Sequence, residues 1–480
     1  MLEEIEKITR EVLKKITPAR ADRARLEKAS RTLESKVSAV CAEFGVDAIV
    51  RLEGSVAKDT WLREDPDIDV FVRLPTSVPR KQLGEIGLKV AKKATQGQEQ
   101  IERFAEHPYL ETFIDNTRVN IVPCYNSMPS EWLSATDRTP YHTDYVNRRL
   151  SKPLRKEVRL LKKFMKGIQV YGAEIKVGGF SGYLCELLVL HFGGFVETLQ
   201  AFSQHMPRRT VDIEGYYANR QRELDLLFKE LLVVVDPVDQ ARNVASAVHP
   251  QQLHSFAAAS RAFLQTPSIE FFYPLKMQPL SVEELHNTIA DRGSSLVFLT
   301  CDKVQAVPDV LWGQLYRTQK ALRKQLQLND FKVLRDAVWS EENAIFTIFV
   351  FELESRILSP AKKHVGPPLE LLKECDRFLA KCSDNSSVVA GPFIEGGRWV
   401  VEVRRKFTDA ADLLRSKLKS GGRDMGVAEL IAENLRKDFL ILIGEDVTEH
   451  YIYNEGFAGF LTEFLSGKPF WLEKPCYFSR

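Results

Sequence analysis

The chain has 480 residues, more than one hydrophobic core normally supports, so two to four domains are expected. Its formal net charge of +2 excludes a uniformly basic surface, so any contact with nucleic acid must come from local patches. The seven cysteines lack zinc or disulfide spacing, and no segment is apolar enough over the length of a membrane span. A cytoplasmic protein with reduced thiols and no membrane partner is therefore expected.

The first part of the chain predicts helices followed by a small sheet. Apolar residues recur at helical spacing over about residues 1–47. The residues after them predict, in order, strands at 48–53 and 67–73, a helix at about 80–95, and strands at 111–114 and 118–122. This order is typical of a small α/β palm, in which the active site opens on one face of the sheet.

A turn of small residues leads into a strand that carries two acids. Gly54, Ser55 and Lys58 supply backbone N–H groups, a hydroxyl and a cation, all of which can hold phosphate oxygens. In the strand that follows, acidic and apolar residues alternate, so Asp67 and Asp69 project from one face about 7 Å apart. Such a pair can share divalent cations, and this layout suits metal-assisted nucleotidyl transfer. A solvated sheet edge beside an ordinary turn would give the same pattern.

From about residue 155 to 260 the pattern becomes helical. Val158, Leu161 and Met165 form the apolar face of one helix, and most of the lysines around it are expected to form a solvated face. Ser181 precedes an apolar helix at about 183–192, so its hydroxyl is expected to cap that helix and not to act as a nucleophile.

Beyond about residue 260 strands and helices are mixed. The pattern predicts strands at 295–299 and 344–351 and helices near 310–327 and 369–382. Two basic patches stand out as candidate RNA contacts, one at Lys362 and Lys363 and one in the strand from Arg398. That strand is expected to carry Arg398 and Arg404 on one face and Trp399 and Arg405 on the other, which suits phosphate contact and base stacking. An amphipathic sheet edge is the ordinary alternative.

The glycine-serine turn followed by two spaced aspartates resembles the DNA polymerase β nucleotidyltransferase superfamily. Further segments are similar to the archaeal, class I, CCA-adding enzymes and run in the family's order. They are residues 57–62, 105–109, 122–125, 137–142, 171–174, 179–187, 236–239 and 242–245. They spread over much of the chain, so the likeness is to this family and not only to the superfamily.

The resemblance implies an α+β multidomain fold. A polymerase β-like nucleotidyltransferase palm would occupy residues 1–154, and a helical central domain with base selection residues 155–260. A mixed α/β C-terminal region that binds RNA would occupy 261–480. The implied function is addition of C, C and A to the tRNA 3′ end from CTP and ATP with Mg²⁺ and without a nucleic-acid template. The resemblance leaves open whether the protein forms a homodimer.

The resemblance also assigns roles to single residues. Asp67 and Asp69 would bind Mg²⁺, while Gly54, Ser55 and Lys58 would contact the triphosphate. Further triphosphate contacts would come from His142, Lys162 and Tyr171, base selection from Arg242, and tRNA contacts from Lys362, Lys363, Arg398, Arg404 and Arg405. Without the resemblance these residues have ordinary readings, such as a salt bridge between Arg242 and Asp236 or Asp239.

One catalytic position departs from the family pattern. The family carries a third carboxylate on the strand before Val122-Pro123-Cys124-Tyr125, and this chain has Asn120 there. An amide is neutral and cannot take a proton from a 3′-hydroxyl. Asp115 is expected in the preceding turn, with its side chain on the other face. A slowed or stalled enzyme is therefore expected, and two alternatives stay open: an inactive relative that binds tRNA 3′ ends, and a poly(A)- or oligoadenylate-type nucleotidyltransferase.

Overall fold

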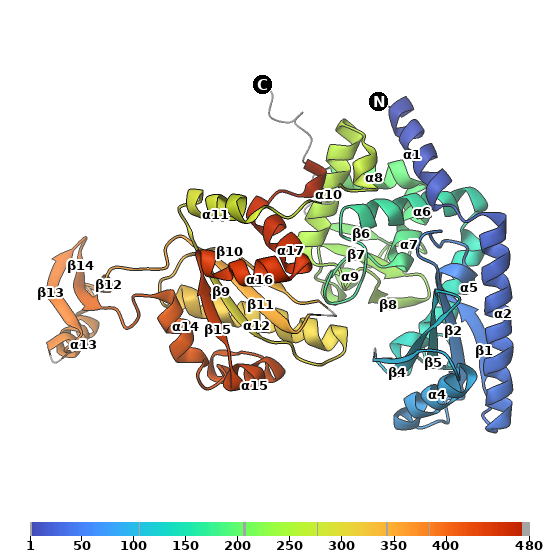
Figure 1. Ribbon diagram of the computed structural model, residues 1–480, viewed down its shortest axis with the longest axis horizontal. Helices are drawn as coiled ribbons and strands as arrows, with labels where there is room; N and C mark the ends of the chain where they lie inside the picture. Colours follow the sequence, from blue (N-terminus) through green and yellow to red (C-terminus); the bar gives the residue numbers. More distant parts are fainter. Residues whose placement is uncertain are drawn as a thin grey trace. The chain divides into compact units, whose positions relative to one another are not determined.

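The computed structural model describes residues 2–104, 106–204, 208–275, 277–341, 344–383 and 385–472 (Figure 1). It contains two compact units. The first runs to Leu275 and takes in the chain again from Pro469, and the second runs from Lys276 to Lys468. Six cysteines are free thiols, while Cys476, and Ala105 of one family-like segment, lie outside the described residues.

The first unit begins with helices and a five-stranded sheet of order β1-β2-β5-β4-β3, in which β2 and β5 are parallel and the other neighbours antiparallel. The predicted strands and the helix between them are confirmed, and β3 is an addition. The elements are α1 (Leu2–Ile16), α2 (Arg20–Glu43), β1 (Ile49–Glu53), α3 (Gly54–Ala57), β2 (Asp67–Leu74), α4 (Arg80–Ala94), β3 (Gln100–Phe104), β4 (Pro108–Ile114) and β5 (Thr117–Tyr125).

This sheet has one apolar and one polar face. Leu33 of α2 and Val90 of α4 pack with Ile68, Val70 and Ile121 of the sheet in one buried cluster, so both helices cover the same face. Alternation along β2 then turns Asp67 and Asp69 to the opposite face, as the sequence predicted. Asp115 lies in the turn between β4 and β5 with a positive φ of 48°, which also agrees with the prediction.

The rest of the first unit is mainly helical. A buried group of phenylalanines, including Phe164, Phe180, Phe256 and Phe263, forms its core. Ser181 caps α7, because its Oγ accepts a hydrogen bond from the N–H of Leu184 at 3.1 Å, as predicted. The small sheet β6-β7-β8 was not predicted. The elements are α5 (Thr139–Arg149), α6 (Lys152–Gly167), α7 (Gly182–Phe192), α8 (Phe195–Ser203), β6 (Arg209–Val211), α9 (Gln221–Leu227), β7 (Leu232–Asp236), β8 (Asp239–Asn243) and α10 (Pro250–Gln265).

The second unit contains a four-stranded sheet, β10-β11-β9-β15, and a separate three-stranded sheet, β12-β14-β13. Helices α12, α14 and α15 share one apolar cluster with the larger sheet, and α11, α16 and α17 share another. The elements are α11 (Val282–Asp291), β9 (Ser295–Asp302), α12 (Pro308–Leu328), β10 (Val333–Trp339), β11 (Phe346–Leu353), β12 (Ala361–Pro368), α13 (Leu372–Ser383), β13 (Val388–Glu395), β14 (Arg398–Arg404), α14 (Ala410–Leu418), α15 (Glu429–Lys437), β15 (Leu440–Ile443), α16 (Thr448–Tyr453) and α17 (Glu455–Ser466).

The predicted fold class, an α+β multidomain chain with a helical part after the first sheet and a mixed C-terminal part, is confirmed. The domain limits stay a prediction, and the boundaries placed at 154 and 260 fall inside α6 and α10. No single helix in the described part of the chain is long and apolar enough to span a membrane. The pair α7 and α8 meets that criterion only when taken together, and it bends by 90°.

Candidate active site

The polar face of the first sheet brings the predicted acids and Asn120 into one place. Strand β5 runs parallel to β2, with Asn120 in register with Asp69 and Arg118 in register with Asp67. The Asn120 amide donates from Nδ2 to Asp69 Oδ1 at 2.9 Å. Asn120 therefore stands where a third carboxylate would flank the pair, but it presents a hydrogen-bond donor toward Asp69.

Asp67 is held by two neighbours. Ser55 Oγ donates to Asp67 Oδ1 at 3.1 Å, and Arg118 Nη2 lies 3.4 Å from Asp67 Oδ2. Sequence reasoning missed Arg118, although the period-two spacing from Asn120 already placed it on the same face. The Ser55 hydrogen bond brings the turn into direct contact with the acidic strand.

The charge at this site fits a divalent cation. Burial raises the pKa of Asp69 to about 7, with a further contribution from neighbouring Asp67, so the pair carries anionic charge that the protein leaves partly uncompensated. No three His, Cys, Asp or Glu side chains in the described ranges group into a metal site of their own. Mg²⁺ is commonly bound by one or two carboxylates together with water and substrate phosphates, so the pair suits it.

Gly54 is required by the close approach of the turn to Asp69. Its φ is +72°, and a Cβ placed there would lie 2.0 Å from Asp69 Oδ2. Any side chain at this position would therefore collide with the carboxylate and would also strain the backbone. Glycine is thus the residue that lets this turn sit against the carboxylates.

A second, buried group lies on α6 and α7 beside the same turn. Lys58 Nζ contacts Glu186 Oε2 at 2.6 Å, Thr60 Oγ1 donates to Glu186 Oε1 at 2.5 Å, and Lys162 Nζ lies 3.5 Å from that oxygen. Burial alone would raise the pKa of Glu186, but the two ammonium groups hold it below its usual range. Burial lowers the pKa of Lys162, although Glu186 acts in the opposite direction. Tyr171 is close by, because a Cβ on Gly182 would lie 3.0 Å from Tyr171 Oη and 3.3 Å from Lys162 Nζ.

The expectation that most lysines of α6 are solvated does not hold for Lys163, and two further cations of the helix are buried as well. Arg159, Lys162 and Lys163 are buried, because acids and carbonyls of the 59–64 segment reach each of them. Sequence reasoning also missed Glu186, whose signal was a single acid inside the apolar run of α7. A charge in such a run is rarely buried without a partner, so it pointed to a cation on a neighbouring element.

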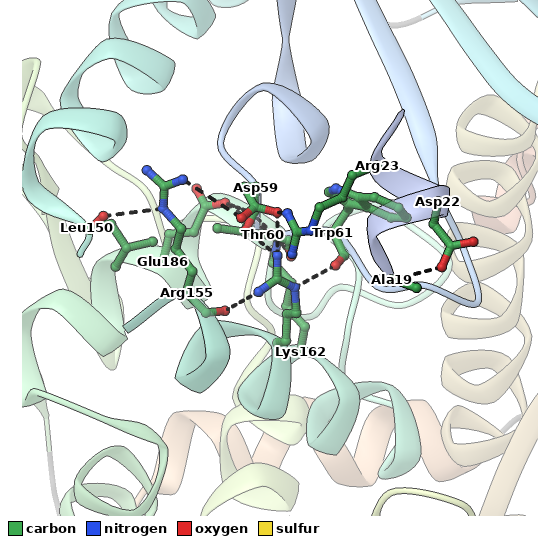
Figure 2. A network of polar contacts seen from close by, with 11 residues as sticks. Ala19, Asp22, Arg23, Asp59, Thr60, Trp61, Leu150, Arg155, Lys162 and Glu186 are labelled. Carbon is green, nitrogen blue, oxygen red and sulfur yellow. Dashed lines mark hydrogen bonds and ion pairs between the residues drawn. The ribbon is translucent and has the colours of Figure 1, made fainter. Parts of the chain in front are cut away.

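The strained turn after Lys58 is fixed by a dense set of polar contacts (Figure 2). Asp59 has a positive φ of 51° and forms ion pairs with Arg23 and, at 2.6 Å, with Arg159. Arg159 Nε also donates to the carbonyl of Trp61 at 2.9 Å, and Lys162 Nζ donates to the carbonyl of Thr60 at 3.2 Å. These bonds connect α2, the turn and α6, and so fix the turn that carries Lys58.

A third group surrounds Asp236 at the end of β7. His142 Nε2 lies 2.9 Å from Asp236 Oδ2, Arg242 Nη1 lies 2.6 Å from the same oxygen, and Tyr183 Oη donates to Oδ1 at 3.1 Å. Burial alone would raise the pKa of Asp236, but the hydrogen bond from His142 and the charge of Arg242 hold it at about 2. Of the two salt bridges considered for Arg242, the one to Asp236 is therefore present.

The three groups are neighbours through Lys58. Its ammonium lies 5.6 Å from the centre of the Tyr183 ring, and the His142 ring stacks on Tyr183 with centres 4.0 Å apart. The charge of Lys58 also acts on the pKa values of Asp69 and His142. The first unit thus gathers Gly54, Ser55, Lys58, Asp67, Asp69, Asn120, His142, Lys162, Tyr171 and Arg242 around one region, although their roles stay predictions.

The five candidate RNA contacts lie in the second unit around β12 and β14. Lys362 Nζ pairs with Asp330 at 2.9 Å, Lys363 Nζ with Glu395 at 2.7 Å, and Arg398 Nε donates to the carbonyl of Gly366 at 2.9 Å. Arg404 is exposed at the end of β14.

Arg405 lies on the face predicted for it. It directly follows the last residue of β14, and it contacts Asp330 together with Lys362, which is in register with Val403 on the Trp399 face. Its guanidinium turns to Asp330, in an ion pair that leaves 17% of the Arg405 side chain exposed. The carboxylate of Asp330 lies on a separate segment of the chain, which period-two alternation could not reveal.

Comparison with known proteins adds to this geometry. Residues 33–142 match the nucleotidyltransferase domain, 156–273 the second domain of tRNA nucleotidyltransferases, and 292–444 the C-terminal domain of the CCA-adding enzyme. The chain is 36% identical over 410 residues to the CCA-adding enzyme of Methanosarcina acetivorans, covering 85% of this chain and 88% of that one. The chain belongs to the archaeal-type CCA-adding enzyme family.

Two further relatives extend the match over nearly all of the enzyme. The CCA-adding enzyme of Halobacterium salinarum is 36% identical over 440 residues, covering 91% of this chain and 94% of its own. That of Haloarcula marismortui is 33% identical over 482 residues, covering 98% and 100%. A solved cytoplasmic RNA terminal U-transferase has a TM-score of 0.43 at 17% identity over 55% of this chain and 95% of its own, too low to carry an argument. The predicted family and enzyme class are confirmed.

Proposed function

We propose that this nucleotidyltransferase adds C, C and A in turn to the tRNA 3′ end, from CTP and ATP, with Mg²⁺ and without a nucleic-acid template. The observation that supports this most is the contact of Ser55 with Asp67, at 3.1 Å, in a chain of the CCA-adding family. It joins a turn suited to phosphate with a carboxylate pair suited to a divalent ion. A cytoplasmic location and a tRNA partner belong to the same proposal.

The residues of the first unit have separate roles in binding the metal ion and the nucleotide. Asp67 and Asp69 hold Mg²⁺, and the bound ion would neutralise charge on the triphosphate and polarise the reacting phosphate. The Gly54 backbone and the Ser55 hydroxyl contact phosphate oxygens. Lys58 and Lys162, on either side of Glu186, supply positive charge beside the triphosphate, and His142 and Tyr171 supply hydrogen-bond donors.

Arg242 selects the base. A guanidinium can donate to acceptors that cytosine and adenine share in position, where uracil and guanine offer donors instead. The salt bridge to Asp236 at 2.6 Å orients Arg242, whose side chain is 36% exposed and so is open to a base. Lys362, Lys363, Arg398, Arg404 and Arg405 contact the tRNA, chiefly along its acceptor stem.

Asn120 slows the enzyme. The amide offers a donor to Asp69 and no negative charge to the side of the site where the 3′-hydroxyl attacks. Nucleotide and tRNA binding depend on other residues and should be largely intact. The proposal is therefore a slow CCA-adding enzyme and not an inactive one.

The test is extension of a tRNA that lacks CCA, with each of the four NTPs and with CTP plus ATP, at high enzyme concentration and in Mg²⁺. The expected products gain two C residues with CTP alone, gain CCA with both nucleotides, and then stop. Tight tRNA binding without any extension would support the inactive relative instead. Repeated addition of A without prior C would support the poly(A)-type alternative.

A further inference from the structure

The row of side chains that contains Asp69 and Asn120 continues onto β4. Glu111 is in register with Asn120 across the antiparallel pair of β4 and β5, just as Asn120 is in register with Asp69 across β5 and β2. Residues directly opposite each other share a face, and their Cβ atoms lie about 4.5–5.5 Å apart. Glu111 is therefore the next side chain beyond Asn120 on the polar face, and it is a carboxylate.

The position of Glu111 is fixed by one neighbour. Arg103 of β3 donates to Glu111 Oε1 from Nη2 at 2.8 Å and from Nε at 3.1 Å. The Glu111 side chain is 11% exposed and that of Arg103 is 21% exposed. Since both bonds go to Oε1, Oε2 lies outside this contact. In the structure the Glu111 carboxylate is held on the β3 side of β4, so it must rotate toward Asn120 to reach a 3′-hydroxyl, and the extra methylene of glutamate provides the length for this.

The charges of Glu111 and of the Asp67 and Asp69 pair all act on the guanidinium of Arg118. Burial lowers the pKa of Arg118, but Asp67, Asp65, Glu111 and Asp69 together raise it above its usual value. The charge of Glu111 is therefore felt at the residue that contacts Asp67. By contrast, Asp115 lies in the turn beyond β4, outside this row.

We propose that Glu111 takes over the role of the missing third carboxylate and accepts the proton of the attacking 3′-hydroxyl. This inference rests on the proposed function. The O3′–H bond breaks and the proton passes to Glu111, while the O3′ electron pair forms the new bond to the α-phosphorus. The bond from that phosphorus to the bridging oxygen breaks, and pyrophosphate leaves with its electrons. The proton on Glu111 then passes to water. Arg103 is a positioning residue, which holds the carboxylate in the row.

The test is a double-mutant cycle in single-turnover CMP addition at saturating CTP. Wild type, Glu111→Gln, Asn120→Asp and the E111Q/N120D double variant are compared. Glu111→Gln should slow wild type by about 10²-fold, because general-base catalysis contributes at least that much. In the Asn120→Asp background the same change should slow the reaction by less than about threefold, because the restored carboxylate takes the proton.

Two further readouts separate catalysis from structure. Glu111→Gln should leave the Mg²⁺-dependent affinity for CTP unchanged, and its loss of rate should persist well below the melting temperature of the variant, which the loss of the Arg103 ion pair alone would not produce. Glu102→Gln is the matched control, since Glu102 lies on β3 in an exposed ion pair with Lys92, and it should leave the rate unchanged.

Several outcomes would overturn the inference. If Glu111→Gln slows wild type and Asn120→Asp equally, Glu111 has a structural role only. If wild type is active and Glu111→Gln leaves its rate unchanged, Glu111 has no part in catalysis. If neither wild type nor Asn120→Asp extends tRNA, the proposed function itself fails and the role of Glu111 fails with it. Extension that depends on Asn120→Asp but not on Glu111 would overturn only the role of Glu111.

Discussion

At the residue scale, the candidate site is defined by how closely Gly54 of the turn approaches a charged strand. Gly54 and Asp69 come from different segments, yet a Cβ on Gly54 would lie 2.0 Å from the carboxylate. Asn120 approaches Asp69 from the other side with its Nδ2 at 2.9 Å. Asp69 is thus enclosed on two sides, and small changes in either neighbour should alter how it binds a cation.

Gly54→Ala should abolish Mg²⁺-dependent CTP binding, because the new methyl group must displace the Asp69 carboxylate. Gly45→Ala is the control, since Gly45 also has a positive φ, of 64°, but no atom lies within 4 Å of its Cβ position. Both variants carry the same kind of backbone strain, roughly 1 kcal/mol or more. Calorimetric titration with CTP should separate them, and equal losses would trace the effect to backbone strain alone.

The stability of the metal-free protein should depend on pH through Asp69. Burial and Asp67 raise its pKa from 3.8 to about 7 in the folded state. The folded protein therefore binds this proton more tightly than the unfolded chain, and the free energy of unfolding falls as pH rises from about 4 to about 7. In EDTA, Asp69→Asn should melt higher than wild type at pH 8, with a smaller difference at pH 5. A difference in melting temperature between the two proteins that is the same at pH 5 and pH 8 would contradict the raised pKa of Asp69.

At the element scale, α6 shows where sequence periodicity stops being informative. The apolar stripe of Val158, Leu161 and Met165 was predicted and is buried. The helical start of the chain and the strands that carry the acids were predicted as well. The burial of Arg159 and Lys162 was not predictable from α6, because their partners lie about 100 positions away at Asp59 and Thr60. Periodicity reports which face is apolar, but it cannot report which distant acid neutralises a cation.

The buried acid of α7 should be essential for stability. Glu186→Gln leaves Lys58 and Lys162 buried without their counter-charge, and we expect a loss on the order of 3 kcal/mol in the free energy of unfolding. Glu64→Gln is a matched control, since Glu64 pairs with Lys163 of the same helix but is 39% exposed. Its loss should be within about 1 kcal/mol. Denaturant titration compares the two, and equal losses would refute the buried network.

Strand β14 offers a similar comparison for tRNA. Arg404→Ala should weaken tRNA binding and reduce the slope of log affinity against log salt by about one unit, as expected for one phosphate contact. Arg405→Ala should have a smaller effect, because its guanidinium is held by Asp330. Filter binding over a range of salt concentrations tests this. A larger effect of Arg405→Ala than of Arg404→Ala would mean that Arg405 leaves Asp330 and contacts the RNA.

At the scale of the whole molecule, the sequence was enough to predict the family and the order of a mixed first sheet, a helical part and a mixed C-terminal part. It also predicted that Asp67 and Asp69 lie on one face of a strand. The domain limits stay a prediction, and the positions chosen for them, 154 and 260, lie inside helices because changes in composition do not mark helix ends. The sequence could not join Glu186 to Lys58 or Asp236 to His142, because only the packing of α5 to α7 on the sheet brings these acids close. Glu111 was missed because it appears beside Asn120 only once the strand register is known.

The most direct test of the central claim, that Asp67 and Asp69 form the Mg²⁺ site of nucleotidyl transfer, is isothermal titration with CTP. It compares wild type, Asp67→Ala and Asp69→Ala, each in Mg²⁺ and in EDTA. We predict that Mg²⁺ tightens CTP binding to wild type, and that either substitution abolishes this tightening, because each removes an anionic ligand of the ion. Mg²⁺-dependent affinities equal to that of wild type in both variants would contradict the account.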